Sequence, residues 1–150
     1  MTKTNVFQVA AFYKFYDLVN LENTQKSFHD FLSKQKIKGT ILLATEGING
    51  TVAGSPNSIE AFKTFLAKEN LLSPSDFKVS LSKKEPFPRL KVKIKNEIVS
   101  IGNDLANPKK IVGEYIKPED WNNFISQDNV LILDARNAYE HSIGSFQNAI

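Results

Sequence analysis

The sequence predicts an α+β fold of the ferredoxin-like type, a βαββαβ sandwich in which two helices cover one face of an antiparallel sheet. Two observations lead to this prediction. Segments rich in β-branched and aromatic residues alternate with segments whose apolar residues recur at helical spacing. Their order along residues 1–101 is β-α-β-β-α-β, and a further strand is predicted near 97–101. Residues 102–114 have the polar, punctuated composition of a linker, and residues 115–150 begin a second domain.

The helices are predicted from their apolar stripes and their terminal residues. The first follows a strand at 6–15, with Asn23 or Thr24 as its N-cap and Gly39 as its stop. The second begins at 55–56, where a serine N-cap precedes a proline at the first helical position. The stripe residues expected to be buried against the sheet are Phe28, Phe31, Ile59, Phe62 and Leu66.

A β-hairpin is predicted between the two helices, because Asn49-Gly50 lies between two apolar runs. Both residues tolerate positive φ, which makes Asn-Gly the strongest short-range hairpin signal. The turn is also a candidate site. Gly47, Asn49 and Gly50 would let the backbone of a partner approach closely, although a hairpin turn needs such residues in any case.

The last two strands are predicted at 77–81 and 90–95, and the second of them alternates apolar and basic residues. Its lysines would share one face at intervals of about 7 Å, close to the spacing of phosphates along a nucleic-acid strand. The candidate RNA-binding residues of this region are Lys83, Lys84, Arg89, Lys91, Lys93 and Lys95. Alternatively, these lysines only protect the edge of the sheet from pairing with another chain.

The composition is that of a globular chain of 150 residues, 41% of them hydrophobic and 23% charged. Residues 1–112 hold 17 basic and 10 acidic residues (net +7), whereas residues 113–150 hold 2 and 6 (net −4). The absence of cysteine excludes disulfides, thiolate metal sites and cysteine nucleophiles. His29 and His141 have no set of ligands near them in sequence, so no metal site is predicted. The apolar segment 6–13 is too short to cross a bilayer, and we expect a cytoplasmic protein.

In the second domain, polar residues follow an apolar run. The run at 130–133 is typical of a parallel strand that is buried on both faces. After it, Arg136 and Glu140 are placed to pair, and Asp134 can accept hydrogen bonds from loop amides. We predict that these three residues brace the loop and do not react.

This run, with Asp134-x-Arg136, Glu140, Ile143-Gly144 and Ala149-Ile150 after it, resembles the opening of a rhodanese domain. Rhodanese domains carry sulfur on a cysteine that lies well beyond this motif. The resemblance therefore implies that the chain ends inside an α/β rhodanese domain, with the catalytic cysteine beyond Ile150 and no catalytic residue in this chain. We expect the truncated domain to be only marginally packed.

Three separated motifs, at 39–54, 86–93 and 113–121, resemble the bacterial rhodanese-related tRNA uridine hydroxylases, in which an acylphosphatase-like, ferredoxin-type domain precedes a rhodanese domain. The resemblance implies oxygen-dependent hydroxylation of the wobble uridine of tRNA to 5-hydroxyuridine. It makes tRNA the partner and molecular oxygen the co-substrate, and no cofactor is identifiable from the residues. The 150 residues alone are expected to be inactive.

Two alternatives stay open at this point. One is a rhodanese-type sulfurtransferase that carries a cysteine persulfide, and the other is a non-catalytic module that binds RNA or protein. Acylphosphatase activity is not expected, because residues 15–21, which correspond to the phosphate-binding loop of those enzymes, contain neither arginine nor glycine. The residues indicate no membrane partner, and they do not indicate an oligomeric state.

Overall fold

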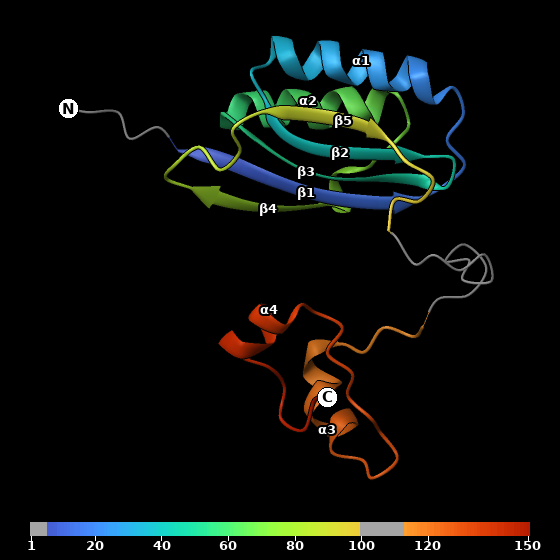
Figure 1. The fold of residues 1–150 in the computed structure, drawn as a ribbon, viewed down its shortest axis with the longest axis vertical. Coiled ribbons are helices and arrows are strands. Elements are labelled where there is room, and N and C mark those ends of the chain that lie inside the picture. The colour runs from blue at the N-terminus through green and yellow to red at the C-terminus, as the bar shows by residue number, and fades with distance from the viewer. Residues whose placement is uncertain (1–5, 100–112) are drawn as a thin grey trace. The chain divides into compact units, whose positions relative to one another are not determined.

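The computed structural model describes residues 6–99 and 113–150, which belong to two compact units (Figure 1). We call residues 6–99 the first unit and residues 113–150 the second unit. The predicted linker lies mostly outside the described residues, so its boundaries stay a prediction. None of the helices among the described residues is long and apolar enough to cross a membrane.

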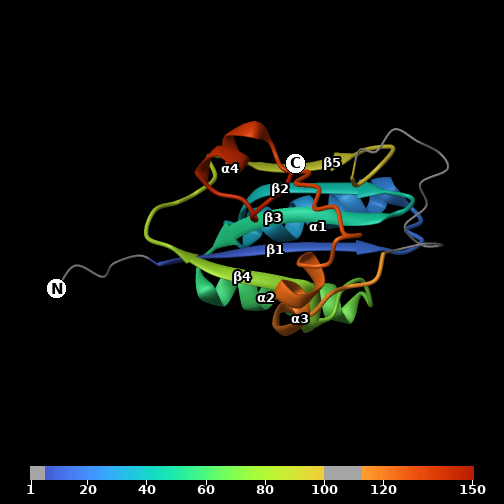
Figure 2. The same cartoon turned by 90° about the horizontal axis from the view of Figure 1, so that it is seen from below.

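The first unit is a five-stranded sheet with two α-helices. Its elements in chain order are β1 (Phe7–Phe15), α1 (Leu21–Lys34), β2 (Lys38–Ala44), β3 (Gly47–Gly54), α2 (Pro56–Lys68), a 3-10 turn (Pro74–Asp76), β4 (Phe77–Ser82) and β5 (Leu90–Ile94). The strand order across the sheet is β4-β1-β3-β2-β5, as Figure 2 shows, and all pairs are antiparallel except β2 with β5. The predicted α+β, ferredoxin-like fold is confirmed.

Both helices lie on the same side of the sheet (Figure 1), and the core fills the space between them and the strands. From the helices, Phe28, Ile59, Phe62 and Leu66 are fully buried, as the apolar stripes predict. Phe31 is only partly buried, and its ring stacks on Phe65 with centroids 4.3 Å apart. The buried strand residues that meet them are Ala10, Phe12, Ile41, Leu43, Ile48 and Val52.

Both predicted ends of α1 are wrong. The helix begins at Leu21, after Asn20 in the left-handed conformation, rather than after Asn23 or Thr24. It ends at Lys34, because Lys36 adopts a positive φ of 55° and the amide of Ile37 returns to the carbonyl of Leu32 at 2.9 Å. A non-glycine residue thus occupies the position at which helices commonly have glycine. Gly39, the predicted stop, lies inside β2.

The predicted hairpin is present, but its turn lies elsewhere. Ala44 pairs with Gly47, so the two-residue turn is Thr45-Glu46, and Asn49-Gly50 falls inside β3. Gly47 has a φ of +149°, and a Cβ built on it would lie 2.1 Å from the carbonyl oxygen of Lys14. The chain can therefore leave this turn only through a glycine.

The predicted strand near 97–101 is not found in its described part, because residues 97–99 are not extended into a strand and 100–101 lie outside the described residues. The strand that extends the sheet beyond the four-stranded ferredoxin pattern is β5 itself. After β5 the backbone amide of Lys95 still donates to the carbonyl of Leu43 at 2.8 Å. Ile98 is then buried, with 1% of its surface exposed.

The second unit contains α3 (Pro118–Ile125) and α4 (Ala138–Ile143), and none of its residues is buried. The predicted buried strand at 130–133 is wrong for the chain as it stands: Leu131 and Leu133 are 73% and 72% exposed. The backbone groups of Ile150 bond to the carbonyl of Ile132 at 3.0 Å and to the amide of Asp134, which follows the run, at 2.8 Å. No strand among the described residues flanks the run, and a parallel strand needs neighbours to be buried.

Candidate functional site

One face of the sheet is open, the face opposite α1 and α2, which we call the free face. In the middle of β1, β2 and β3, over residues 10–13, 38–43 and 48–52, buried residues of the helix side alternate with residues that are partly or fully exposed. Towards the strand ends, Ala44 and Ala53 of the free face are buried. The cross-strand pairs on the free face include Ala11 with Thr51 and Tyr13 with Asn49. The middle of this face therefore presents mostly small side chains together with Tyr13, and solvent can reach them.

All charged residues in the described strands are lysines. Lys14 is on the helix side and bonds to Asp76 at 3.0 Å. The register places the other four on the free face: Lys78 on β4 at one edge, Lys38 on β2, and Lys91 and Lys93 on β5 at the other edge. Lys38 pairs with Glu85 at 2.8 Å, but Lys78, Lys91 and Lys93 have no ion-pair partner among the described residues. The free face is therefore electropositive at both edges.

The predicted RNA-binding residues fall in two groups. Lys91 and Lys93 lie in β5 and Lys95 follows it directly, whereas the other three belong to the connection between β4 and β5: Lys83, Lys84 and Arg89. All six are exposed or half-exposed. Because β5 is an edge strand, its position fits edge protection as well as RNA binding.

The free face also carries residues that the sequence interpretation did not select. Tyr13 is 52% exposed and is the only exposed large aromatic residue in the described first unit. Its ring meets that of Phe15 edge to face, with centroids 6.4 Å apart. Alternation along the first strand could have identified both, because the buried residues Ala10 and Phe12 place the odd-numbered positions on the opposite face.

The residues of the predicted turn have a structural contact in common. The Glu46 carboxylate accepts a hydrogen bond from the amide of Ile98 at 2.7 Å, and the Asn49 side chain donates to the carbonyl of Ile98 at 2.8 Å. Both backbone groups of a buried residue are thus satisfied by the hairpin. Gly50 pairs with Phe12 across the sheet, and a Cβ built on Gly50 would lie 2.8 Å from the Phe12 ring. These contacts explain the segment without a ligand, and a functional role for Gly47, Asn49 and Gly50 stays a prediction.

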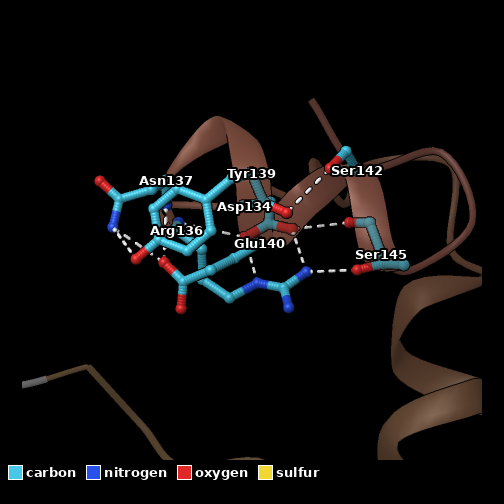
Figure 3. A network of polar contacts seen from close by, with 8 residues as sticks. Asp134, Arg136, Asn137, Tyr139, Glu140, Ser142 and Ser145 are labelled. Atoms are coloured by element: carbon cyan, nitrogen blue, oxygen red, sulfur yellow. Dashed lines mark hydrogen bonds and ion pairs between the residues drawn. The ribbon is translucent and has the colours of Figure 1, made fainter.

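In the second unit, Asp134 is the centre of a polar network (Figure 3). The Arg136 guanidinium donates to both carboxylate oxygens of Asp134, at 2.9 and 2.7 Å, and also to the carbonyl of Gly144 at 2.7 Å. The Ser145 hydroxyl donates to Asp134 at 2.7 Å, and the Arg136 amide does so at 3.1 Å. Asp134 therefore accepts from a loop amide as predicted, and it links both ends of the loop.

The predicted pairing of Arg136 with Glu140 is wrong. Glu140 instead accepts hydrogen bonds from the Asn137 amide at 3.1 Å and from the Asn137 side chain at 2.8 Å, which forms a capping box at the start of α4. Asparagine followed three residues later by glutamate is a recognisable capping pattern. The planar guanidinium of Arg136 therefore binds the carboxylate of Asp134, with which it forms a two-point contact.

Acid should weaken this network. Hydrogen bonds from Arg136 and then Ser145 hold the pKa of Asp134 well below its usual range. A lowered pKa in the folded state stabilises the loop above the unfolded value of about 4, and this contribution declines as the pH falls below it. Titration of the Arg136 amide by NMR should show its hydrogen bond lost only in that range. A loop that keeps this bond unchanged at the lowest pH, or an Asp134→Asn variant with the same pH dependence, would contradict the expectation.

A cavity of about 500 Å³ lies beside the connection from β1 to α1. Tyr16 lines it together with Asn20, Asn23 and Phe65, and no arginine or lysine is among its lining residues. Burial raises the pKa of Tyr16 to about 12. No group of three or more metal-binding side chains occurs among the described residues.

Comparison with known proteins gives the family. The model of the UPF0176 acylphosphatase-like domain matches residues 7–98. The tRNA uridine(34) hydroxylase of Bartonella quintana is 49% identical over 144 residues, which are 96% of this chain and 47% of that protein. The protein of the same name from Picosynechococcus sp. is 46% identical over 96% of this chain and 48% of its own length. The chain thus spans about half the length of the curated relatives it matches.

Among solved structures, an acylphosphatase from Coxiella burnetii is similar over 62% of this chain and 100% of its own, at 13% identity and a TM-score of 0.42. The BlrP1 BLUF structure is similar over 61% of this chain and 64% of its own, at 11% identity and a TM-score of 0.46. The family match covers β1 to β5 with both helices, which is more than half of the chain. The chain therefore belongs to the UPF0176 acylphosphatase-like domain family.

Proposed function

We propose that this chain is the N-terminal part of a tRNA-modifying enzyme that hydroxylates the wobble uridine of tRNA to 5-hydroxyuridine, and that its lysine-bearing sheet edge holds the tRNA. The relatives named for this reaction support the activity. The observation that supports the RNA-binding role is the charge of the free face, whose strands carry lysines and no acidic residue.

In the proposed reaction one oxygen atom is added at C5 of the uracil ring, so that a C–H bond becomes C–OH. Molecular oxygen is the proposed source of this atom, and its second oxygen atom leaves as water, with two electrons and two protons supplied by a reducing co-substrate. We place the catalytic cysteine in the part of the relatives that this chain does not span, since the chain itself contains no cysteine. The role left for the first unit is to bind and orient the RNA.

Phosphate binding by β5 has a simple geometric basis. Residues two apart in a strand lie about 7 Å from each other on one face, so Lys91 and Lys93 can each reach a different phosphate of one RNA strand. Lys95 continues this series just beyond the strand. Each neutralised phosphate releases counterions, which makes the binding strong at low salt and weak at high salt.

Replacing Lys91, Lys93 and Lys95 together by glutamate should therefore weaken tRNA binding by about tenfold or more and flatten its salt dependence. Fluorescence anisotropy with labelled tRNA at several salt concentrations measures both quantities. The logarithmic salt slope should fall by about two, because each contact to a single strand contributes about 0.7.

The matched control changes the same net charge on the helices. Lys26, Lys34 and Lys68 are all exposed, and their joint replacement by glutamate should affect binding much less. Equal losses of tRNA affinity in both triple variants would mean that only the overall charge matters. Unchanged affinity in the β5 variant would mean that these lysines only protect the edge of the sheet. In the full-length protein, the β5 variant should also lower the 5-hydroxyuridine content of tRNA, measured by nucleoside mass spectrometry.

A further inference from the structure

We infer that the free face binds unpaired RNA bases and that Tyr13 is the side chain on which a base stacks. The inference rests on the proposed function, because it takes the lysines at the sheet edges as the phosphate contacts. It adds the kind of RNA, which is a single-stranded segment rather than a duplex.

The position of Tyr13 is the first argument. Tyr13 lies on β1, an inner strand of the sheet, and pairs with Asn49 of β3. The pairing of β1 with β4 reaches Phe12, so Tyr13 lies one residue beyond the start of β4. A tyrosine that is 52% exposed there, with no hydrogen-bond partner among the described residues, presents an aromatic surface to solvent. Phe15 packs against this ring edge to face, with the two ring centroids 6.4 Å apart.

The neighbours of Tyr13 are the second argument. On the side away from Phe15, the free-face side chains beside Tyr13 on β1 and β3 are small, with Ala11 next to it along β1 and paired across to Thr51. On that side, a planar ring can lie flat on the surface without meeting a bulky side chain. Base stacking on an aromatic side chain tolerates any base, since every base has a π-face.

The third argument is the arrangement of charge. Lys78 lies at the β4 edge and Lys91 with Lys93 at the β5 edge, so the aromatic centre is flanked by cations on both sides. Adjacent strands are about 4.8 Å apart, which places the β5 lysines about 14 Å from β1, within reach of the backbone of a nucleotide stacked on Tyr13. Sheets that bind single-stranded RNA combine aromatic platforms with basic flanks in this way. A duplex has no free base face to offer.

Replacing Tyr13 by serine should weaken binding of a short unstructured oligoadenosine by about tenfold, a typical loss for one stacked base. Binding of a duplex RNA of the same length should not change. Tyr13→Phe should keep the affinity, and Tyr13→Leu, which retains the bulk without the aromatic ring, should lose it. The matched control is Tyr139→Ser, the same chemical change at an exposed tyrosine of the second unit.

The salt dependence separates this inference from the proposed function. Loss of a stacking contact lowers the affinity at every salt concentration and leaves the slope unchanged, whereas loss of lysines changes the slope. If the lysine variant loses RNA while Tyr13→Ser and Tyr13→Leu do not, the stacking inference is wrong and the proposed function stands. Equal loss of affinity for single-stranded and duplex RNA in the Tyr13 variants would overturn the inference. It would also be overturned if no Tyr13 variant had an effect because a protein partner occupies the free face.

Discussion

Replacing Phe62 by alanine should lower the free energy of unfolding of the first unit by about 3–5 kcal/mol, the usual cost of removing a buried phenylalanine. The Phe62 side chain is fully buried, and its ring contacts those of Phe12, Phe28 and Phe31 at centroid distances of 5.8, 6.2 and 6.2 Å. It therefore joins a strand and both helices. Because small domains have about 5–15 kcal/mol of total stability, the variant should be close to unfolding.

Chemical denaturation followed by far-UV circular dichroism measures this loss. Trp121, the only tryptophan of the chain, lies in the second unit, so its fluorescence reports that unit separately and should change little. Leu81→Ala is the control, because Leu81 is 71% exposed and its truncation should cost about 0.5 kcal/mol or less. Equal costs for the two variants would contradict the packing described for α2.

Replacing Gly47 by alanine should cost about 2–4 kcal/mol, which is large for the addition of a single methyl group. Two effects add together. The φ of +149° is unfavourable for an L-residue with a side chain, and the new Cβ would lie 2.1 Å from the Lys14 carbonyl oxygen. Lys14 is held in place by its pairing with Ile48, so the neighbour cannot move away without breaking the sheet.

Urea denaturation compares this variant with Gly113→Ala, where a new Cβ meets nothing within 4 Å. The Gly113 variant should differ from the parent by about 0.5 kcal/mol or less. Hydrogen exchange should also become faster at the Ile98 amide, whose acceptor Glu46 precedes Gly47 directly. A Gly47 variant as stable as the Gly113 variant would mean that the turn is not at Thr45-Glu46.

The helix faces were predictable because they depend on local spacing. The buried positions of Phe28, Ile59, Phe62 and Leu66 follow from a period near 3.6, whatever the helices pack against. The helix ends were less predictable. Lys36 and Asn70 adopt the left-handed conformation that usually selects glycine, because the hydrogen bonds that close each helix compensate for the strain.

The hairpin shows how tertiary contacts override a local signal. Asn49-Gly50 has the strongest turn propensity in its region, yet Asn49 holds the Ile98 carbonyl and Gly50 makes room for Phe12. Both partners are distant in sequence, so no local pattern could reveal them. The register instead keeps Ile48 and Val52 on the core side, which the burial of apolar residues requires.

The candidate site was predictable in part. The alternation of 90–95 correctly places Lys91 and Lys93 on one face. That Tyr13 and Lys78 share this face depends on the strand order, which brings β4, β1 and β5 into one sheet and is not encoded in any single segment. In the second unit, the sequence offered Arg136 two carboxylates, those of Asp134 and Glu140, at similar separations. Glu140 caps the helix α4 through Asn137, and Arg136 therefore pairs with Asp134.

The contacts of Ile98 with the hairpin have a mechanical consequence. Tension that arrives along the chain from beyond Val99 reaches Ile98 first, where Glu46 and Asn49 hold its amide and carbonyl. Without this attachment, pulling would peel β5 from β2 one hydrogen bond at a time, beginning with the bond from the Lys95 amide to Leu43. With it, the load passes into the β2–β3 hairpin near the middle of the sheet, and the edge strand that carries Lys91 and Lys93 is relieved of force.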